Sequence, residues 1–355
     1  MIHVGIDLHT RNMTLAAVKD NSEIVMCQKV ACNTTELAQF FTQLSPPVQA
    51  VVESTSNWYW LDDWCKSNGI PLKLAHANML KAISYAKVKT DKVDATTIAE
   101  LSRGKLIPEA WKTEKRQREL RELTRGRLKC LHLRDKIQNQ IRSTAQKYNV
   151  TIKSGQWRHH LTLKKWLHEQ LPDEIYVQTR LLLDLLAEVQ KCIHQIEKEI
   201  DRHIWYEEDL KRLLEIPGIG TVSAWTILAE IGDITRFSSA DKFVSYCRLV
   251  PGSNDSGDRR RHKSSKDGNK YLRMAFGHAA IGAYTHHKVV KSFYERKRKK
   301  KGPFIARTLV AKELARIVWY ILAQGHSYKG FKGKMTDTNK CSCWPQPVSP
   351  DSMLG

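Results

Sequence analysis

The chain has 355 residues, of which 41% are hydrophobic, and a formal net charge of +21 at neutral pH. This length predicts two or three domains with ordinary hydrophobic cores. No stretch of roughly 18 uncharged apolar residues exists, so we expect no membrane span. We also expect no signal peptide, because a strand-like run begins at once. The eight cysteines are scattered, as is typical of reduced thiols in the cytoplasm, where we expect the protein to act.

The positive charge is concentrated in two segments. Residues 101–150 carry fourteen Lys and Arg against five Asp and Glu, and residues 251–300 carry fourteen against four. Residues 1–100 and 151–250 are close to neutral. A merely solubilising surface would spread its charge, whereas two basic zones beside near-neutral regions are typical of proteins with a polyanionic partner. The distribution therefore predicts binding to nucleic acid.

Residues 1–108 alternate between strand-like and helix-like patterns. Alternating apolar and β-branched runs indicate strands, and capping residues and helical periodicity indicate helices. We expect strands over 4–8, 11–18, 23–30, 48–53 and 70–75, and helices over 35–44, 58–68 and 91–103. The first three strands would form a meander, and the later ones would alternate with helices. This order predicts an α/β domain with a mixed sheet covered by helices.

Four carboxylates in this first region are candidates for a metal site. Asp7 lies near the end of the first strand, Glu53 ends a central strand, and Asp91 and Asp94 share one face of a helix's first turn. Taken singly, Asp7 could cap a turn, and the two helical acids could complement the helix dipole. In a ribonuclease H-like sheet, however, these positions converge at one edge. There they could hold two Mg²⁺ ions about 4 Å apart for phosphodiester chemistry.

An ATPase fold of the actin and sugar-kinase type is the alternative for the opening Gly-Ile-Asp-Leu. That fold needs small residues where this chain has His9, together with a second Gly-rich phosphate loop. Neither that loop nor a P-loop is found in the sequence. The nucleic-acid interpretation is therefore preferred.

The remainder of the chain is expected to be mostly helical. Residues 109–205 contain two long amphipathic helices, separated by an irregular segment around Gly155, that would pair as a coiled-coil arm. The arm could be a dimerisation and nucleic-acid element or a plain spacer. Residues 206–325 would form a helical domain that contains a helix-hairpin-helix motif. In it, Gly218 and Gly220 would let backbone amides approach a phosphate, unless the motif is only a tight turn. Residues 326–355 are expected to be disordered.

A polar segment in this helical domain contains a candidate nucleophile. Ser256 precedes Gly257 and a basic run of Arg259, Arg260, Arg261 and Lys263, in what we predict to be an exposed loop. Guanidinium groups there could hold a scissile phosphate while the serine attacks phosphorus. A basic loop with incidental serines is the alternative that this segment alone would favour.

Five motifs taken together resemble one family, the DEDD-type insertion-sequence transposases of the insertion sequence one hundred and ten family, which includes the Piv DNA invertases. The motifs occur in the family's order over nearly the whole chain. They are Gly-Ile-Asp at 5–7, Val-Glu at 52–53, Thr-Asp-Lys-Val-Asp-Ala at 90–95, Ile-Pro-Gly-Ile-Gly at 216–220 and Leu-Val-Pro with Ser-Gly between 249 and 257. One departure is that a single serine, Ser256, stands before the glycine where family members often have two. Ser256 is thus the preferred nucleophile and Ser253 a weaker one.

The resemblance implies a RuvC-like ribonuclease H-fold domain, a coiled-coil arm and a C-terminal transposase domain. It implies that Asp7, Glu53, Asp91 and Asp94 bind Mg²⁺ and that Ser256 forms a phosphoserine link to DNA. The implied partners are double-stranded DNA, both element ends and target, and a structured bridge RNA that guides the enzyme. A homodimer or homotetramer would complete the site. A Piv-like invertase, a RuvC-like junction nuclease that uses water, and a non-catalytic nucleic-acid-binding protein remain the alternatives.

Overall fold

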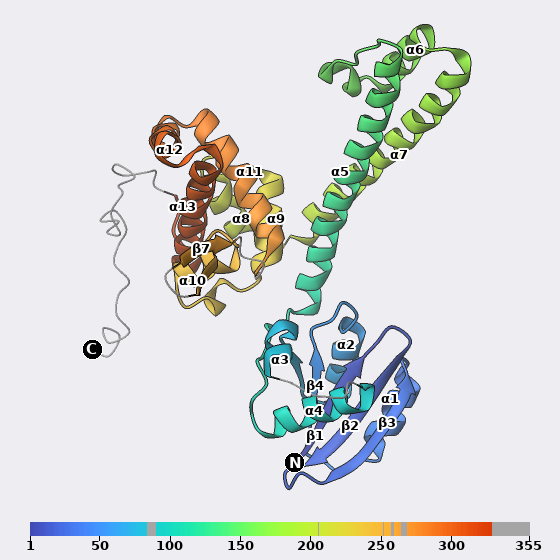
Figure 1. The fold of residues 1–355 in the computed structure, drawn as a ribbon, viewed down its shortest axis with the longest axis vertical. Helices are drawn as coiled ribbons and strands as arrows, with labels where there is room; N and C mark the ends of the chain where they lie inside the picture. The colour runs from blue at the N-terminus through green and yellow to red at the C-terminus, as the bar shows by residue number, and fades with distance from the viewer. Residues whose placement is uncertain (84–89, 205, 251, 257–258, 264–267, 329–355) are drawn as a thin grey trace. The chain divides into compact units, whose positions relative to one another are not determined.

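The computed structural model describes residues 1–83, 90–204, 206–250, 252–256, 259–263 and 268–328. The chain divides into two compact units, Met1–Lys115 and Arg116–Gly355 (Figure 1). The expected disordered tail lies mostly outside the described residues. No helix within the described ranges is both long and apolar enough to cross a bilayer.

The first unit is a mixed sheet with helices on both faces. Its strands follow the order β3-β2-β1-β4-β5, with β2 antiparallel to both β1 and β3, and with β4 and β5 parallel to β1. The elements, in chain order, are β1 (Ile2–Leu8), β2 (Asn12–Lys19), β3 (Ile24–Ala31), α1 (Thr34–Thr42), β4 (Val48–Glu53), α2 (Tyr59–Ser67), β5 (Leu72–Ala75), α3 (Ala77–Ile83) and α4 (Asp91–Arg103).

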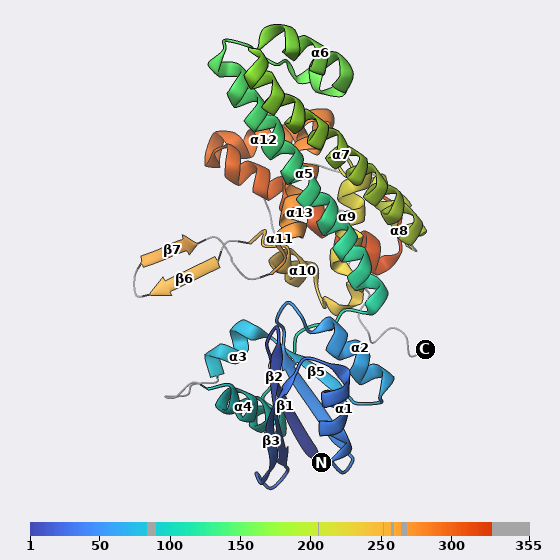
Figure 2. The same cartoon turned by 90° about the vertical axis from the view of Figure 1, so that its right-hand side faces the viewer.

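Alternate residues of β1 face different helices, as a strand's two-residue repeat requires. Ile2, Val4, Ile6 and Leu8 belong to a buried core with the apolar residues of α1 and α2. The opposite face carries α4, which packs on β1 and β2, and a smaller core that includes Val51 and residues of α3 and α4. Figure 2 shows the sheet nearly edge-on, with α1 and α2 on one side and α3 and α4 on the other.

The second unit is helical except for one hairpin. Its elements, in chain order, are α5 (Lys115–Lys147, whose first residue belongs to the other unit), η1 (Ser154–Arg158), α6 (His160–Gln170), α7 (Asp173–His203), α8 (Glu207–Leu214), α9 (Thr221–Ile231), η2 (Ile234–Arg236), α10 (Ala240–Tyr246), β6 (Gly252–Ser256), β7 (Arg259–Lys263), α11 (Lys270–His286), α12 (Lys288–Lys301) and α13 (Pro303–Gln324).

The helices of this unit form two principal packing regions. The long helices α5 and α7 run side by side (Figures 1 and 2), with α6 packed at one end of the pair and a shared core of branched apolar residues. The remaining helices, from α8 to α13, enclose the largest core of the protein, centred on residues such as Phe243, Phe276 and Leu314. The smaller core that contains Leu120 and Ile200 packs the base of the α5–α7 pair against α9.

The predicted elements are largely present, with two differences. The five expected strands and three expected helices of the first unit all occur, with ends shifted by a few residues. The segment around Gly155, expected to be irregular, contains η1 and is followed by α6, a helix that the sequence did not indicate. The expected loop around Ser256 is instead the β6–β7 hairpin. The proposed domain limits at 108 and 205 stay predictions; the first compact unit ends at Lys115.

Candidate active site

The candidate site is a row of polar residues that crosses the sheet of the first unit on the α4 face. Asp7 of β1 pairs with Thr14 of β2, and Thr14 pairs with Lys29 of β3. Ile6 pairs with Val52 on the other side, so Glu53 of β4 comes at the level of Asp7. Paired residues on neighbouring strands point to the same face. The row therefore runs Lys29, Thr14, Asp7, Glu53 from the β3 edge inward.

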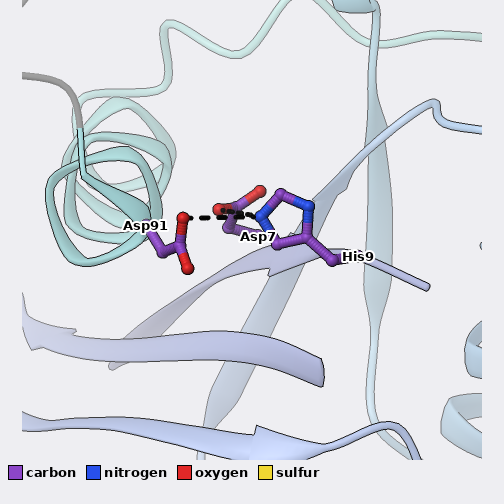
Figure 3. Close-up of side chains that lie close together, drawn as sticks. All are labelled: Asp7, His9 and Asp91. Carbon is purple, nitrogen blue, oxygen red and sulfur yellow. Dashed lines mark hydrogen bonds and ion pairs between the residues drawn. The ribbon is translucent and has the colours of Figure 1, made fainter. Parts of the chain in front are cut away.

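Three side chains meet above the centre of this row. His9 Nε2 lies 3.1 Å from Asp7 Oδ2 and 3.6 Å from Asp91 Oδ1 (Figure 3). The potential ligand atoms of Asp7, His9 and Asp91 all lie within 4.8 Å of one another. Asp7 comes from the end of β1, His9 from the turn that follows and Asp91 from the first turn of α4. The structure thus brings together two residues that are 84 positions apart in the sequence.

Helix α4 can reach this position because β1 has a glycine beneath it. A Cβ atom on Gly5 would lie 2.5 Å from Ala99 N and closer still to Ala95 O. A real Cβ does not approach backbone atoms so closely, so only glycine lets α4 lie this near the sheet. Thr90 caps the helix, with its Oγ1 accepting a hydrogen bond from Val93 N. The cap fixes where the first turn begins and therefore where Asp91 and Asp94 stand.

The electrostatics of the cluster differ from one carboxylate to the next. Partial burial raises the pKa of Asp7, and the charges of Asp94 and Asp91 raise it further, against the opposing effect of His9. A hydrogen bond and charge attraction from Lys29 hold the pKa of Asp91 below its ordinary value. Asp94 is thus near enough to act on Asp7, although its oxygens are outside the group of three around His9.

Two lysines accompany the acids. Lys29 Nζ donates to Asp91 Oδ2 at 2.7 Å, and Lys81 Nζ of α3 lies 3.9 Å from Glu53 Oε1. Neither lysine was predicted from the sequence as a site residue, and neither was His9. His9 could have been found, because a residue two positions after Asp7 on an extended chain points to the same side. Lys29 could not, because its place depends on the register of two strand pairs.

The residues present fit a hard divalent cation. Carboxylate oxygens are the ligands that Mg²⁺ prefers, and close like charges such as those of Asp7, Asp91 and Asp94 are stabilised by a cation between them. The ammonium group of Lys29 lies beside Asp91, and that of Lys81 lies beside Glu53. Glu53, on the strand next to Asp7 and 24% exposed, completes the acidic side of the row.

The serine hairpin belongs to the second unit, where β6 and β7 pair so that Ser256 stands opposite Arg259. The predicted phosphate-binding residues Arg259 to Lys263 thus form the second strand of the same hairpin. Residues 257–258, which connect the strands, lie outside the described residues. Ser256 is therefore placed next to the tip of a two-stranded ribbon and beside the basic strand.

The base of the segment that carries this hairpin is closed by hydrogen bonds. Arg248 Nε donates to Gly268 O at 2.8 Å, and Asn269 N donates to Tyr246 O at 2.6 Å. Gly268 has a positive φ of 96°, and a Cβ there would overlap Tyr246 O. The point where the chain leaves the helical core after α10 therefore lies beside the point where it returns before α11.

A fully buried carboxylate, Glu230 at the end of α9, fastens this point to helix α5. Its oxygens accept hydrogen bonds from Arg125 at 2.7 and 2.8 Å and from Asn269 Nδ2 at 2.7 Å. Arg121 and Gln117, also on α5, donate to the last carbonyl groups of α9. The side chain of Asn269 in turn caps α11. One network therefore links α5, α9 and the end of the serine segment.

The two glycines of the helix-hairpin-helix motif have different surroundings. A Cβ on Gly218 would lie 2.5 Å from Ala283 N, so this glycine, with φ of 88°, permits close packing on α11. Gly220 stands before the first turn of α9 with open space where a Cβ would be. Packing thus accounts for Gly218 without a ligand, whereas no packing contact at the Cβ position accounts for Gly220.

Comparison with known proteins assigns the chain to a class. A family model described as Transposase, of the DEDD type, matches residues 4–150, and a second, described as Transposase IS116/IS110/IS902 family, matches residues 210–295. The protein is a DNA transposase. The DEDD type of the first model indicates that it uses a divalent metal ion. The two matches together span about two thirds of the sequence, and the chain belongs to the IS116/IS110/IS902 family.

Individual relatives agree with this assignment. The chain is 28% identical to the transposase for insertion sequence element IS1111A of Coxiella burnetii over 74% of each chain. It is 24% identical to a probable family 20 transposase of Pseudomonas aeruginosa over 92% of this chain and 98% of the relative. The pilin gene-inverting protein of Moraxella bovis is 26% identical over 92% and 97% of the two chains.

Proposed function

We propose that the protein is a Mg²⁺-dependent site-specific recombinase that cuts and rejoins the DNA of an insertion sequence through a serine nucleophile. Asp7, Glu53, Asp91 and Asp94 would hold the metal ions, and Ser256 would attack the DNA. The metal assignment rests on one observation. The side chains of Asp7 and Asp91 lie together around His9, and Glu53 stands beside Asp7 on the neighbouring strand.

The fold of the first unit supports this proposal. Its strand order, with a three-stranded antiparallel meander followed by two parallel strands, is the arrangement expected of a ribonuclease H-like domain. In such a sheet the acids at the ends of the central strands share one edge with the start of a following helix. Asp7, Glu53 and the first turn of α4 occupy these positions here.

The reaction divides into two exchanges at phosphorus. The Ser256 hydroxyl would attack the scissile phosphate, a bond would form between its oxygen and phosphorus, and the bond to the 3′-oxygen would break. The serine proton would pass to a base and a proton would reach the leaving 3′-oxygen. A 3′-hydroxyl from another strand would then reverse these steps and release the serine, so no ATP is needed. Bound Mg²⁺ would supply stabilisation of charge on the phosphate oxygens.

The basic zones support nucleic-acid partners. Most of the positive charge of residues 251–300 lies on two elements of the helical unit. These are β7 and the end of α12, from Arg296 to Lys300. We propose that they hold the backbones of the element ends and target DNA and of a structured guide RNA, which would read sequence by base pairing. A homodimer or homotetramer would then bring acids and serine together.

A covalent adduct tests the serine assignment. Protein would be incubated with Mg²⁺, labelled DNA that contains an element end, and RNA transcribed from the element's non-coding end. We expect a protein–DNA band that survives denaturation and that Ser256→Ala abolishes, whereas the matched variant Ser253→Ala retains it. Asp7→Ala should also abolish the adduct while DNA binding persists. An undiminished adduct in Ser256→Ala would exclude this nucleophile.

Two alternatives give different results in the same experiment. A junction nuclease that uses water would cut DNA without any adduct. A DNA invertase, favoured by the likeness to the pilin gene-inverting protein, would form the adduct but would invert a segment between two sites of a plasmid instead of moving it.

A further inference from the structure

A hollow beside the acid cluster takes no part in the function proposed above. Its volume is about 390 Å³, and it lies over the β2–β3 side of the sheet, next to the start of α4. It is lined by Thr14, Cys27, Lys29, Thr90, Asp91 and Lys92. The hollow is thus continuous with the metal site through Asp91, yet most of its lining comes from residues that are not acids.

A buried hydroxyl in this lining has no partner. Thr14 is only 3% exposed, and its Oγ1 has no hydrogen-bond partner within the part of the chain that the structure describes. Buried polar groups are almost always hydrogen-bonded, so an exception calls for an explanation. The register places Thr14 between Asp7 and Lys29 on the α4 face. A ligand in the hollow would give this hydroxyl its missing partner.

The remaining polar groups of the hollow favour an anion. Lys29 and Lys92 bring two ammonium groups, and no ion pair of Lys92 occurs among the described residues. Asp91 is neutralised by Lys29, whose ammonium has three donors and gives one to Asp91 Oδ2. The start of α4, a helix of 13 residues, adds the positive end of its dipole. Two lysines, two hydroxyls and a helix start are groups that bind phosphate.

We propose that this hollow is a second phosphate subsite. It would hold a phosphodiester that neighbours the scissile one on the same DNA strand. The inference rests on the proposed function, since it takes the acid cluster as the cutting site. Neighbouring strands are about 4.8 Å apart, so the backbone of Lys29, two strands from Asp7, lies roughly 10 Å across the sheet from it, and the Lys29 ammonium reaches back as far as Asp91. One DNA strand carries a phosphate every 3.4 Å or so of helix axis. A strand cut at Asp7 therefore has further phosphates within reach of Lys29, and these would fix its direction.

Alkylation of Cys27 tests the subsite without any catalysis. The half-buried Cys27 thiol lines the hollow, so a small alkylating reagent should modify it in the free protein, as located by mass spectrometry. The full-length Ser256→Ala protein would be titrated in EDTA with a short single-stranded DNA. We expect the DNA to slow alkylation of Cys27 and an oligonucleotide of the same sequence with uncharged methylphosphonate links not to do so.

Variants connect the protection to the lysines. Lys29→Gln combined with Lys92→Gln should raise the DNA concentration for half-protection at least about tenfold, the effect of losing one hydrogen bond to a charged group. Lys19→Gln is the matched control, because Lys19 is also a strand lysine in an ion pair, with Glu23, but lies outside the hollow. It should change the half-protection concentration by less than about twofold, as expected of an exposed surface charge.

Several outcomes would overturn the proposal. These are equal protection by the uncharged oligonucleotide, an unchanged titration in the double lysine variant, or a Cys27 thiol that does not react in the free protein. Stronger protection by RNA than by DNA would assign the hollow to a guide instead. Because no step of the reaction occurs in EDTA, these results are independent of the adduct experiment, and failure of the serine mechanism would leave them unaffected.

Discussion

Asp7 shows how two requirements on one side chain conflict. Its place on the central strand puts it under α4, where partial burial and the nearby Asp91 and Asp94 disfavour its charge and raise its pKa. Binding a divalent cation requires that charge. The site is therefore arranged at some cost to the stability of the metal-free protein, as is common for functional residues.

We expect Asp7→Asn to raise the melting temperature of the protein in EDTA by a few degrees at neutral pH. Because the folded-state pKa of Asp7 is raised, folding favours the protonated form, and the charge destabilises the fold at pH values above that pKa. A neutral amide removes this penalty. The gain should fade as the pH falls toward the ordinary pKa of an aspartate, where wild type is also neutral. Differential scanning calorimetry over a pH series measures both effects.

The counterpart of that gain is the loss of metal binding. Added Mg²⁺ should raise the melting temperature of wild type but not of Asp7→Asn. If wild type in EDTA at neutral pH already melts at a higher temperature than the variant, the assigned direction of the Asp7 pKa is contradicted.

At the residue scale, the sequence indicates where the acids stand better than it indicates their neighbours. Asp7, Glu53, Asp91 and Asp94 can be singled out because each stands at the end of an element whose type is readable from periodicity. His9 has two signals in the sequence: an ATPase loop would not tolerate it, and its spacing of two residues from Asp7 puts it on the same side of an extended chain. Lys29 and Thr14 carry no local signal, since their positions follow from strand register, which depends on the whole meander.

Among the elements, α4 depends most on a single position of another element. Gly5 lies beneath Ala95 and Ala99, so the distance between α4 and the sheet is set by the absence of one side chain. That distance in turn sets how far Asp91 is from Asp7. The geometry of the candidate metal site is therefore a consequence of sheet–helix packing.

Gly5→Ala should displace α4 and destabilise the first unit by about 1–3 kcal/mol, the usual range for overpacking. It should also weaken Mg²⁺ binding, because Asp91 and Asp94 move with the helix. Gly126→Ala in α5 is the matched control: a Cβ there meets nothing within 4 Å, and the change should be neutral or stabilising. Denaturant unfolding measures the change in stability, and calorimetric titration measures the Mg²⁺ affinity. An unchanged Mg²⁺ affinity in Gly5→Ala would contradict the dependence of the metal site on the packing of α4.

The elements that the sequence missed are those whose pattern is obscured or absent. Helix α6 has apolar residues at helical spacing, but its Trp and His residues and its short length obscure the period. Strands β6 and β7 are almost wholly polar, so no alternation of apolar residues marks them. Such strands are specified by backbone pairing and by the closed base of the segment, which a local pattern does not reveal.

On the scale of the whole molecule, the two compact units differ in how they are held together. The first is a sheet with helices on both faces. The second encloses the large core of α8–α13 and, in addition, a buried network in which Glu230 joins α9 to α5. Removing one partner of a buried ion pair leaves an uncompensated charge and is strongly destabilising. The network therefore makes the stability of the second unit sensitive to one side chain.

We expect Glu230→Gln to lower the free energy of unfolding of the second unit by about 3–5 kcal/mol and to leave the first unit unchanged. Glu197→Gln is the matched control, because Glu197 also pairs with an arginine of α5, Arg127, but is 29% exposed and should contribute less than about 1 kcal/mol. Hydrogen exchange resolved by peptide distinguishes the units; equal effects of the two variants would contradict a special role for Glu230.

The closed base of the serine segment has a consequence for how such an enzyme can change. Because Arg248 and Gly268 are joined by a hydrogen bond, and Tyr246 and Asn269 by another, the ends of the intervening stretch are already side by side. A ribbon of different length or composition can be grafted between these anchor residues without altering the helices that carry them. Changes in the β6–β7 hairpin, in nature or by design, are thereby uncoupled from the folding of the helices that carry it.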